Sequence, residues 1–170
     1  ELFADNQGRV ALIMKALSNP FFGRMKTGAR NCASLRGIAL EVFGIERESD
    51  VEHQIAIVDN LIARGFRAIA IAPADSRKLF PVCKKALDKG VIVINIDNPF
   101  HKARLAEHGI SIPFVGSETT SGTVRQGKLT VRIVQQPEET GRIAVKSAFE
   151  DRRGDRLPPL KPVELELLKQ

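Results

Sequence analysis

The sequence contains no tryptophan and no tyrosine, and only two of its 170 residues are cysteine. Two cysteines are too few for a disulfide scaffold, and Cys32 and Cys83 both fall where a helix is expected. We therefore expect two buried and unreactive thiols. Because tryptophan and tyrosine are missing, any flat apolar ring that this chain offers to a ligand must come from its nine phenylalanines.

Long apolar runs are also missing. No stretch approaches the roughly 18 continuous apolar residues that a membrane-spanning helix needs, which excludes insertion into a membrane. The first residues, ELFADNQGR, lack the basic start and the apolar run of a secretory signal. The chain is therefore expected to be either a cytoplasmic protein or the mature form of a processed one, without its signal peptide.

The charge of the chain is mildly basic, with 26 Lys and Arg against 20 Asp and Glu and a formal net charge of +6. A basic balance raises the question of nucleic-acid binding. The basic residues are scattered, however, and often lie beside acidic ones, as in Glu46-Arg47-Glu48. No long basic run, aromatic-interleaved strand or zinc-knuckle spacing occurs. We interpret the charge as a solvated surface and expect no nucleic-acid partner.

Patterns typical of buried strands alternate with patterns typical of amphipathic helices. The mostly apolar run Val10–Leu17 predicts a strand buried on both faces, and Ser18-Asn19-Pro20 follows it as a turn. From Phe21 to Leu35 apolar residues recur at helical spacing, which predicts a helix ending at Gly37. The unit then repeats. Further strands are predicted at Ile38–Phe43, Phe66–Ile71 and Val91–Ile96, with helices between them that end at Gly65 and Gly90.

Strands that alternate with helices at this spacing imply βαβ units with right-handed crossovers. The predicted fold class is α/β: a parallel sheet between two layers of helices, flavodoxin-like, with two extra strands. Ligands of such sheets bind beyond the carboxyl ends of the strands. The loops expected to carry function are therefore residues 18–22, 44–50, 72–76 and 97–100.

The alternation stops after Pro113–Glu118. The small polar stretch Thr119–Thr123 has no apolar periodicity and is interpreted as a turn or linker. Leu129–Val134 and Val163–Leu168 are the two extra strands, and Pro137 begins a helix between them. One compact domain is predicted. Its parts are the β-α repeats (1–118), a linker and strand (119–135), a returning helix (136–154) and a C-terminal loop and strand (155–170).

No catalytic or metal-binding set is found in the sequence. Glycine-rich phosphate loops and nucleophile elbows are absent, because the glycines lack the required spacing and partners. His53, His101 and His108 have neither metal-ligand spacing nor an adjacent cysteine. We therefore predict that the chain is not an enzyme and that it binds no metal and no cofactor.

What remains is polar and aromatic residues at the ends of two predicted strands. Asn19, Phe21 and Phe22 follow the first strand, and Asp97 and Asn98 follow the fourth. An amide and a carboxylate can each make paired hydrogen bonds to neighbouring hydroxyls, while phenyl rings cover the apolar faces of a sugar ring. Turn, core and helix-cap roles explain each residue singly. Taken together, they make a site for a polyol an equally good explanation.

The motifs LSNPFFGRMKTGA, IAPADS, INID and PFVGSE, in that order, resemble those of the type I periplasmic binding proteins, specifically the ribose-binding branch. VRQGKLTVRIVQQP and the terminal PVELELLKQ are similar to the last segments of that branch. The resemblance implies a non-catalytic receptor in the periplasm. Such a receptor holds a sugar or sugar alcohol in a cleft between two lobes and presents it to an ABC transporter permease or a chemoreceptor.

The resemblance also implies roles for individual residues. Asn19 corresponds to a hydrogen-bonding amide of the first loop, and Phe21 and Phe22 correspond to its stacking rings. Asp97 corresponds to a carboxylate that grips sugar hydroxyls, and Gln135 to a glutamine near a hinge crossing.

Asn98 departs from the ribose-binding pattern, in which an arginine follows the aspartate. An arginine supplies a charged fork with several donors, whereas asparagine supplies a short amide. The expected ligands therefore extend from ribose to another pentose, a hexose or a sugar alcohol.

Between Glu118 and Arg125 the chain passes from the first hinge crossing of this family to the approach of the second, so nearly the whole second lobe is expected to be missing. Half a cleft cannot enclose a ligand, and weak sugar binding by the monomer follows. The two extra strands are expected to pair with each other, with the remaining sheet or with a second copy. A homodimer or interaction module is therefore one alternative function. A small α/β enzyme or flavin carrier is the other.

Overall fold

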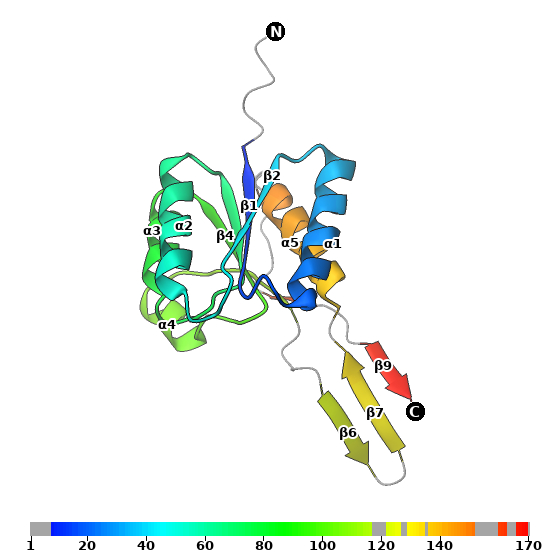
Figure 1. The fold of residues 1–170 in the computed structure, drawn as a ribbon. Helices are drawn as coiled ribbons and strands as arrows, with labels where there is room; N and C mark the ends of the chain where they lie inside the picture. The colour runs from blue at the N-terminus through cyan, green and yellow to red at the C-terminus, as the bar shows by residue number, and fades with distance from the viewer. Residues whose placement is uncertain are drawn as a thin grey trace.

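A six-stranded parallel sheet, in the order β2-β1-β3-β4-β5-β8, forms the centre of the computed structural model (Figure 1). The structure describes residues 8–116, 122–126, 129–134, 136–151, 160–162 and 166–169. The strands of this sheet are β1 (Val10–Met14), β2 (Leu40–Gly44), β3 (Ala68–Ile71), β4 (Ile92–Ile96), β5 (Phe114–Gly116) and β8 (Leu160–Pro162). All the pairings between them are parallel.

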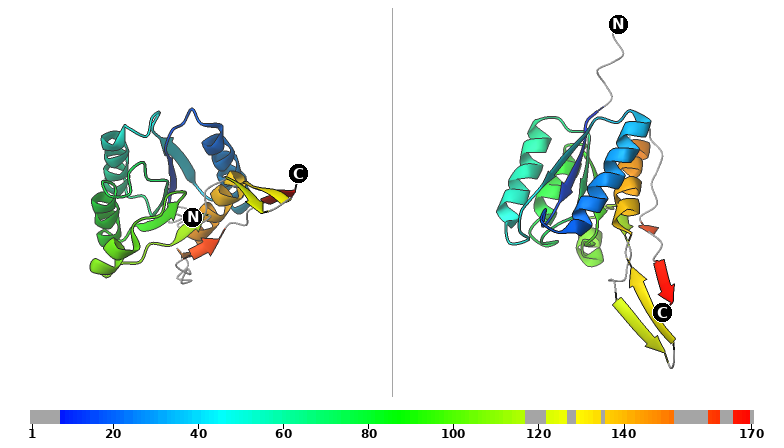
Figure 2. Two further views of the ribbon diagram at one scale, coloured as in Figure 1. Left: turned by 90° about the horizontal axis from the view of Figure 1, so that it is seen from below. Right: turned by 45° about the vertical axis from the view of Figure 1, so that its right-hand side comes forward.

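Helices cover both faces of this sheet, which gives three layers (Figure 2). One face is covered by α1 (Pro20–Arg36) and α5 (Pro137–Asp151). The other is covered by α2 (Val51–Ala63) and α3 (Phe80–Asp88), with the short α4 (Lys102–Glu107) beside them. The predicted α/β class and its sandwiched parallel sheet are confirmed.

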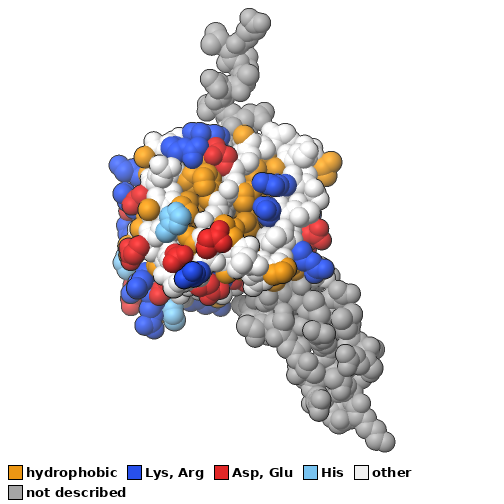
Figure 3. All heavy atoms as spheres, viewed as in Figure 1, with side chains coloured by type: hydrophobic (Ala, Val, Ile, Leu, Met, Phe, Trp, Pro, Cys, Tyr) orange, Lys and Arg blue, Asp and Glu red, His pale blue; other side chains and the backbone are white. Residues whose placement is uncertain are grey.

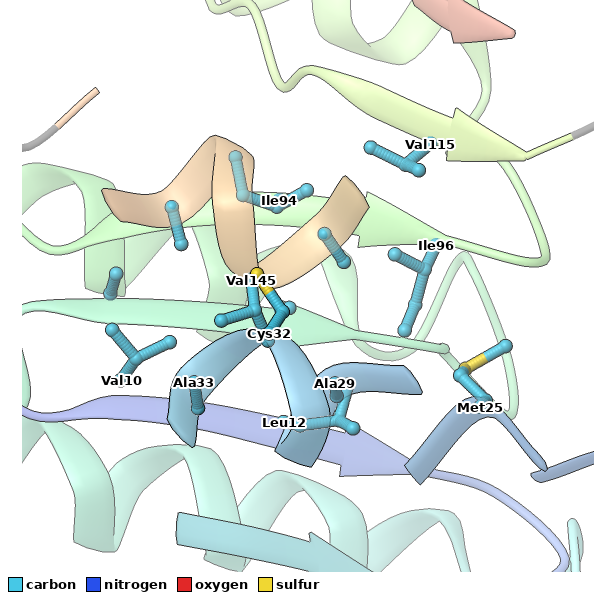
Figure 4. Close-up of a cluster of buried hydrophobic side chains, with 14 of the residues drawn as sticks. Val10, Leu12, Met25, Ala29, Cys32, Ala33, Ile94, Ile96, Val115 and Val145 are labelled. Carbon is cyan, nitrogen blue, oxygen red and sulfur yellow. The ribbon is translucent and has the colours of Figure 1, made fainter. Parts of the chain in front are cut away.

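The position of strand β1 between the two layers of helices explains why its sequence is almost continuously apolar. Val10, Leu12 and Met14 face the core under α1 and α5, whereas Ala11 and Ile13 face the core under α2 and α3. All five residues are at most 1% exposed. Burying a Leu or Ile side chain contributes about 1.5–3 kcal/mol, so a strand buried on both faces must be apolar at every position. The core under α1 and α5 is drawn in Figure 4, and Cys32 of α1 and Val145 of α5 both belong to it.

Helices α1 and α5 approach each other closely. A methyl group added to Gly28 of α1 would overlap the backbone oxygen of Glu138, and one added to Gly141 of α5 would overlap the backbone oxygen of Met25. Each helix therefore places a glycine against the backbone of the other. This contact holds the returning helix, α5, on the same face of the sheet as α1.

A second sheet lies outside the three layers (Figure 1). It is antiparallel, in the order β6-β7-β9, and consists of β6 (Gly122–Gln126), β7 (Leu129–Val134) and β9 (Glu166–Lys169). The two predicted extra strands therefore pair with each other, as β7 and β9. The interpretation of Thr119–Thr123 as a linker is wrong at its end, because Gly122 and Thr123 belong to β6.

Strands β5, β6 and β8 are three further strands that the sequence pattern does not predict. β8 has only three residues and joins the edge of the main sheet, where it pairs with β5 and where its terminal proline is tolerated. β8 pairs with β5, and β6 pairs with β7, so both strands form through partners outside their own segments. Periodicity within the segment carries little of that information.

The surface of the three-layer body mixes charges of both signs. On the face seen in Figure 3, Lys and Arg side chains are interspersed with Asp and Glu side chains. Among the described residues, no helix has the length and apolar character needed to cross a membrane.

Candidate functional site

The carboxyl end of the main sheet carries a buried lysine between two carboxylates. Lys15 follows β1 directly, and its Nζ lies 3.3 Å from Asp97 Oδ2 in the loop after β4 and 3.3 Å from Glu48 Oε1 in the loop after β2. The Lys15 side chain is 8% exposed, that of Asp97 14% and that of Glu48 55%. A buried charge must be paired to be tolerated, so these contacts tie three loops together at one edge.

Asp97 adopts a strained backbone conformation at this edge. Its φ is +64°, in the left-handed region, which costs a non-glycine residue about 1 kcal/mol. The neighbouring Asn95 holds this turn in place and is itself only 2% exposed. Its Nδ2 donates to the backbone oxygen of Asn98 at 2.8 Å, and its Oδ1 accepts from the backbone N–H of Phe100 at 2.9 Å. Asn95 therefore fixes the loop that presents the Asp97 carboxylate.

Asn98 is turned toward the neighbouring loop. Its Nδ2 lies 3.4 Å from the backbone oxygen of Pro73, in the loop after β3. That loop is fixed in turn by Gln54 of α2, which is fully buried. The Gln54 side chain donates to Ala72 O at 2.9 Å and accepts from Ala74 N at 2.8 Å. Two buried carboxamides, Asn95 and Gln54, thus hold adjacent loops of the edge.

Asn19 caps the N-terminus of α1. Its Oδ1 accepts a hydrogen bond from the backbone N–H of Phe21 at 2.9 Å, and its own N–H donates to Ala16 O at 2.8 Å. Pro20 occupies the first turn, where its missing donor costs nothing. The side chain is exposed, and capping uses only its oxygen. Its NH₂ group therefore remains able to donate to a ligand hydroxyl.

The two predicted stacking rings lie in different surroundings. Phe21 and Phe22 contact each other edge to face, with ring centroids 5.2 Å apart. Phe22 is 3% exposed and belongs to the core under α1 and α5, while Phe21 is only partly buried. Phe21 has the larger exposed surface of the two, and stacking on a ligand stays a prediction for both.

Of the six residues that the sequence predicts for the site, the structure places five at the carboxyl edge. Asn19, Phe21 and Phe22 lie at the start of α1, and Asp97 and Asn98 follow β4. Gln135 lies outside the described residues. The Lys15–Asp97 ion pair joins the ends of β1 and β4 directly.

Sequence reasoning missed Lys15, Glu48 and Asn95. Lys15 is hidden inside the predicted strand Val10–Leu17, whereas β1 ends at Met14. The single charge within this apolar run could have indicated a site residue, because a buried lysine needs a carboxylate as its partner. Asn95 gives a similar signal, as a lone polar residue within VIVINI.

A shallow pocket of about 570 Å³ extends the edge toward the loop after β3. Asp75 lies on its wall and accepts hydrogen bonds from the backbone N–H groups of Arg77 at 2.8 Å and Lys78 at 2.9 Å. The hydrogen bond from Lys78, and to a smaller extent that from Arg77, holds the pKa of the Asp75 carboxyl below its usual value of 3.8. Asp75 is therefore an ionised turn residue.

Neither cysteine belongs to this edge. Cys32 and Cys83 are both buried, as predicted, and desolvation raises the pKa of the Cys83 thiol to about 12. Among the described residues, no three His, Cys, Asp or Glu side chains are grouped so that they could hold a metal ion.

Residues 10–151 match the family described as Periplasmic binding protein domain. The chain belongs to the periplasmic binding protein family. The family that the sequence motifs resemble is therefore confirmed, and the match covers all of the main body from β1 to α5.

Named relatives lie within the sugar-binding part of the family. The chain is 41% identical over 135 residues to the D-ribose/D-allose-binding protein of Pseudomonas aeruginosa. This alignment covers 78% of the chain but only 42% of that relative. The chain thus spans less than half the length of this relative.

Solved structures agree with the assignment. An ABC transporter solute-binding protein from Burkholderia multivorans is 29% identical, with a TM-score of 0.61, and the alignment covers 92% of this chain and 59% of that one. A periplasmic solute-binding protein from Actinobacillus succinogenes with bound D-allose is 24% identical, with a TM-score of 0.62 and coverage of 92% and 58%. The second likeness concerns the fold alone.

Proposed function

We propose that this chain binds a sugar or sugar alcohol without chemical conversion, as one lobe of a periplasmic solute-binding protein that serves an ABC transporter. The single observation that carries this proposal is the Lys15–Asp97 pair at the carboxyl edge of a parallel sheet. Loops at this edge are where α/β sheets bind ligands. The names of the relatives supply the class of ligand.

Each group has a role in holding a ring of hydroxyls. The Asp97 carboxylate accepts from two adjacent hydroxyls, and the NH₂ group of Asn19 and the ammonium group of Lys15 donate to sugar oxygens. The exposed part of the Phe21 ring covers an apolar face of the sugar. Such a set recognises a polyol by hydrogen bonds.

D-Allose and D-ribose are the first ligands to test. Both occur in the name of the Pseudomonas relative, and D-allose occurs in that of the Escherichia coli relative. Asn98 stands where the ribose-binding pattern has arginine, which favours a ligand that needs fewer charged donors at this position.

We expect the described edge to bind weakly on its own, because it supplies one wall of a cleft. Without a facing wall, the ligand keeps much of its water and makes fewer hydrogen bonds. We expect a dissociation constant on the order of millimolar.

The test is a titration of the ¹⁵N-labelled chain with D-allose, D-ribose and myo-inositol, followed by two-dimensional NMR. The proposal expects saturable shifts at the backbone N–H groups of the 15–22 and 95–100 loops. Asp97→Asn should weaken binding at least about tenfold, since a carboxylate hydrogen bond contributes about 1.5–3 kcal/mol. Asp88→Asn, an exposed change at the end of α3, is the matched control and should have no effect. Shifts spread over the surface, or an unchanged affinity in Asp97→Asn, would refute the site.

A homodimer is the second candidate, and the β6-β7-β9 sheet favours it. This sheet lies outside the three layers (Figure 1), and its outer strands β6 and β9 each pair on one side only within the described part of the chain. Unpaired strand edges invite further strands. Analytical ultracentrifugation over a concentration series tests this candidate, and a monomer at the highest concentration would remove it.

A further inference from the structure

We propose that Glu48 sets the charge selectivity of the carboxyl edge, so that the site accepts uncharged sugars and excludes sugar acids and sugar phosphates. This inference rests on the proposed sugar-binding function and concerns the same site. It assigns a role to the loop after β2, which contributes none of the sequence-predicted residues.

The geometry places two carboxylates on one ammonium group. Lys15 Nζ lies 3.3 Å from Asp97 Oδ2 and 3.3 Å from Glu48 Oε1. One positive charge balances one negative charge, so this three-residue cluster carries a net charge of −1. Asp97 and Lys15 neutralise each other, and Glu48 supplies the excess.

Burial decides which carboxylate a ligand meets first. The side chains of Lys15 and Asp97 are 8% and 14% exposed, whereas that of Glu48 is 55% exposed. The balanced pair is thus enclosed and the excess negative charge lies on the solvent side. An anionic ligand that approaches Lys15 and Asp97 must pass close to Glu48. A neutral sugar meets no such repulsion and can accept from or donate to the same carboxylate.

The remaining charges near this edge are arranged differently. Glu46 and Arg47 share the loop with Glu48 and are exposed, and neither is paired with Lys15. On the loop after β3, Asp75 shares its turn with two opposite charges, Arg77 and Lys78, whose backbone N–H groups donate to it. Charges that do not contact Lys15 or Asp97 act on a ligand there through solvent, where salt screens them within about 10 Å. Glu48 is therefore the excess charge in direct contact with the binding pair.

The experiment uses a matched pair of ligands, D-ribose and D-ribose 5-phosphate, which differ by one anionic group. The quantity measured is the ratio of their dissociation constants, obtained by NMR titration of the full chain at low salt. In the unchanged protein we expect the phosphate to bind more weakly. Glu48→Gln should lower the ratio about tenfold, which is the size of the interaction of unit charges about 6 Å apart at an effective dielectric constant of about 40.

Two variants separate charge from structure. Glu46→Gln removes the same charge from the same loop without touching Lys15, and it should change the ratio less than about twofold. Glu48→Asp keeps the charge and should keep the ratio of the unchanged protein. Thermal melting of each variant confirms that it is folded. Independently of any variant, raising the salt concentration should lower the ratio in the unchanged chain, because screening weakens the repulsion.

The outcomes are distinguishable. If D-ribose and D-allose produce no saturable shifts in the unchanged chain, the proposed function fails and this inference fails with it. If the neutral sugars bind but Glu48→Gln leaves the ratio unchanged, or Glu46→Gln lowers it equally, the inference alone is overturned. The inference is supported if the ratio of dissociation constants falls in Glu48→Gln and is unchanged in Glu48→Asp.

Discussion

Gly28 and Gly141 face each other's helices across the contact between α1 and α5, and each occupies a place where a side-chain methyl group would overlap backbone atoms. The contact joins the first helix of the body to the helix that returns after β7. It therefore determines whether α5 can close the core over β3 and β4, where Ala144, Val145 and Ala148 are fully buried.

Alanine at either glycine should force the two helices apart. We expect Gly28→Ala and Gly141→Ala each to lower the free energy of unfolding by about 1–3 kcal/mol, the usual cost of overpacking. Urea denaturation measures this change. Gly23→Ala is the matched control on α1, because its methyl group would meet open space. That control should stabilise the helix by about 0.5–1 kcal/mol. Equal effects at positions 23 and 28 would contradict the close contact.

The Lys15–Asp97 pair should show strong energetic coupling. Lys15→Met leaves the Asp97 carboxylate without its partner, and Asp97→Asn leaves the buried ammonium with Glu48 alone. In a double-mutant cycle we expect a coupling free energy of about 1–3 kcal/mol. The exposed pair Lys84 and Asp88 on α3 is the comparison and should couple by about 0.5 kcal/mol or less. Similar coupling in both cycles would show that burial does not strengthen the inner pair.

Asn95→Ala should destabilise the protein and loosen the edge at the same time. The substitution leaves the backbone oxygen of Asn98 and the N–H of Phe100 without the partners that they have now. The expected loss of unfolding free energy is about 2 kcal/mol. Hydrogen exchange should also accelerate in residues 96–100. Asn60→Ala, an exposed change on α2, should alter stability by less than about 0.5 kcal/mol. Unchanged exchange in the loop would argue against the positioning role of Asn95.

Asp75 should make a pH-dependent contribution to the stability of the folded protein. Hydrogen bonds from the Lys78 and Arg77 backbone lower the pKa of its carboxyl in the folded state below the usual value of 3.8. A lowered folded pKa stabilises the protein above the unfolded value, and the stabilisation is lost as the pH falls through the folded value. The melting temperature of Asp75→Ala should therefore differ from that of the unchanged chain at neutral pH. The difference should shrink toward pH values below about 3. A constant difference across this range would contradict the shift.

The α/β body could be predicted from the sequence because its strands are buried on both faces and its helices end at glycines. Gly37, Gly65 and Gly90, the predicted helix ends, all have positive φ. The helix α4 has six residues and no buried side chain, so it leaves no periodic pattern to find. Strand β8 has three residues and exists through its pairing with β5.

The candidate site could be predicted only in part. Loops after strands are placed by topology, which is why Asn19 and Asp97 could be found. Lys15 could not be recognised as a site residue without knowing that Asp97, in the loop after β4, lies within reach of its ammonium group, although β3 separates β1 from β4 in the sheet. Glu48 depends on the same kind of spatial fact, because its loop follows β2, which lies beside β1 in the sheet.

The buried carboxamides of Gln54 and Asn95 have a consequence for how this edge meets a ligand. Both bond to the main chain of loops at the carboxyl edge, and both are shielded from water. The loops are thus ordered when the protein folds, and little conformational entropy is left to lose on association. The affinity of this edge for a ligand is then limited by the number of contacts that the edge makes with it. A facing surface supplied by a second polypeptide would meet loops that are already ordered, so we expect it to raise the affinity for a sugar without any rearrangement of this chain.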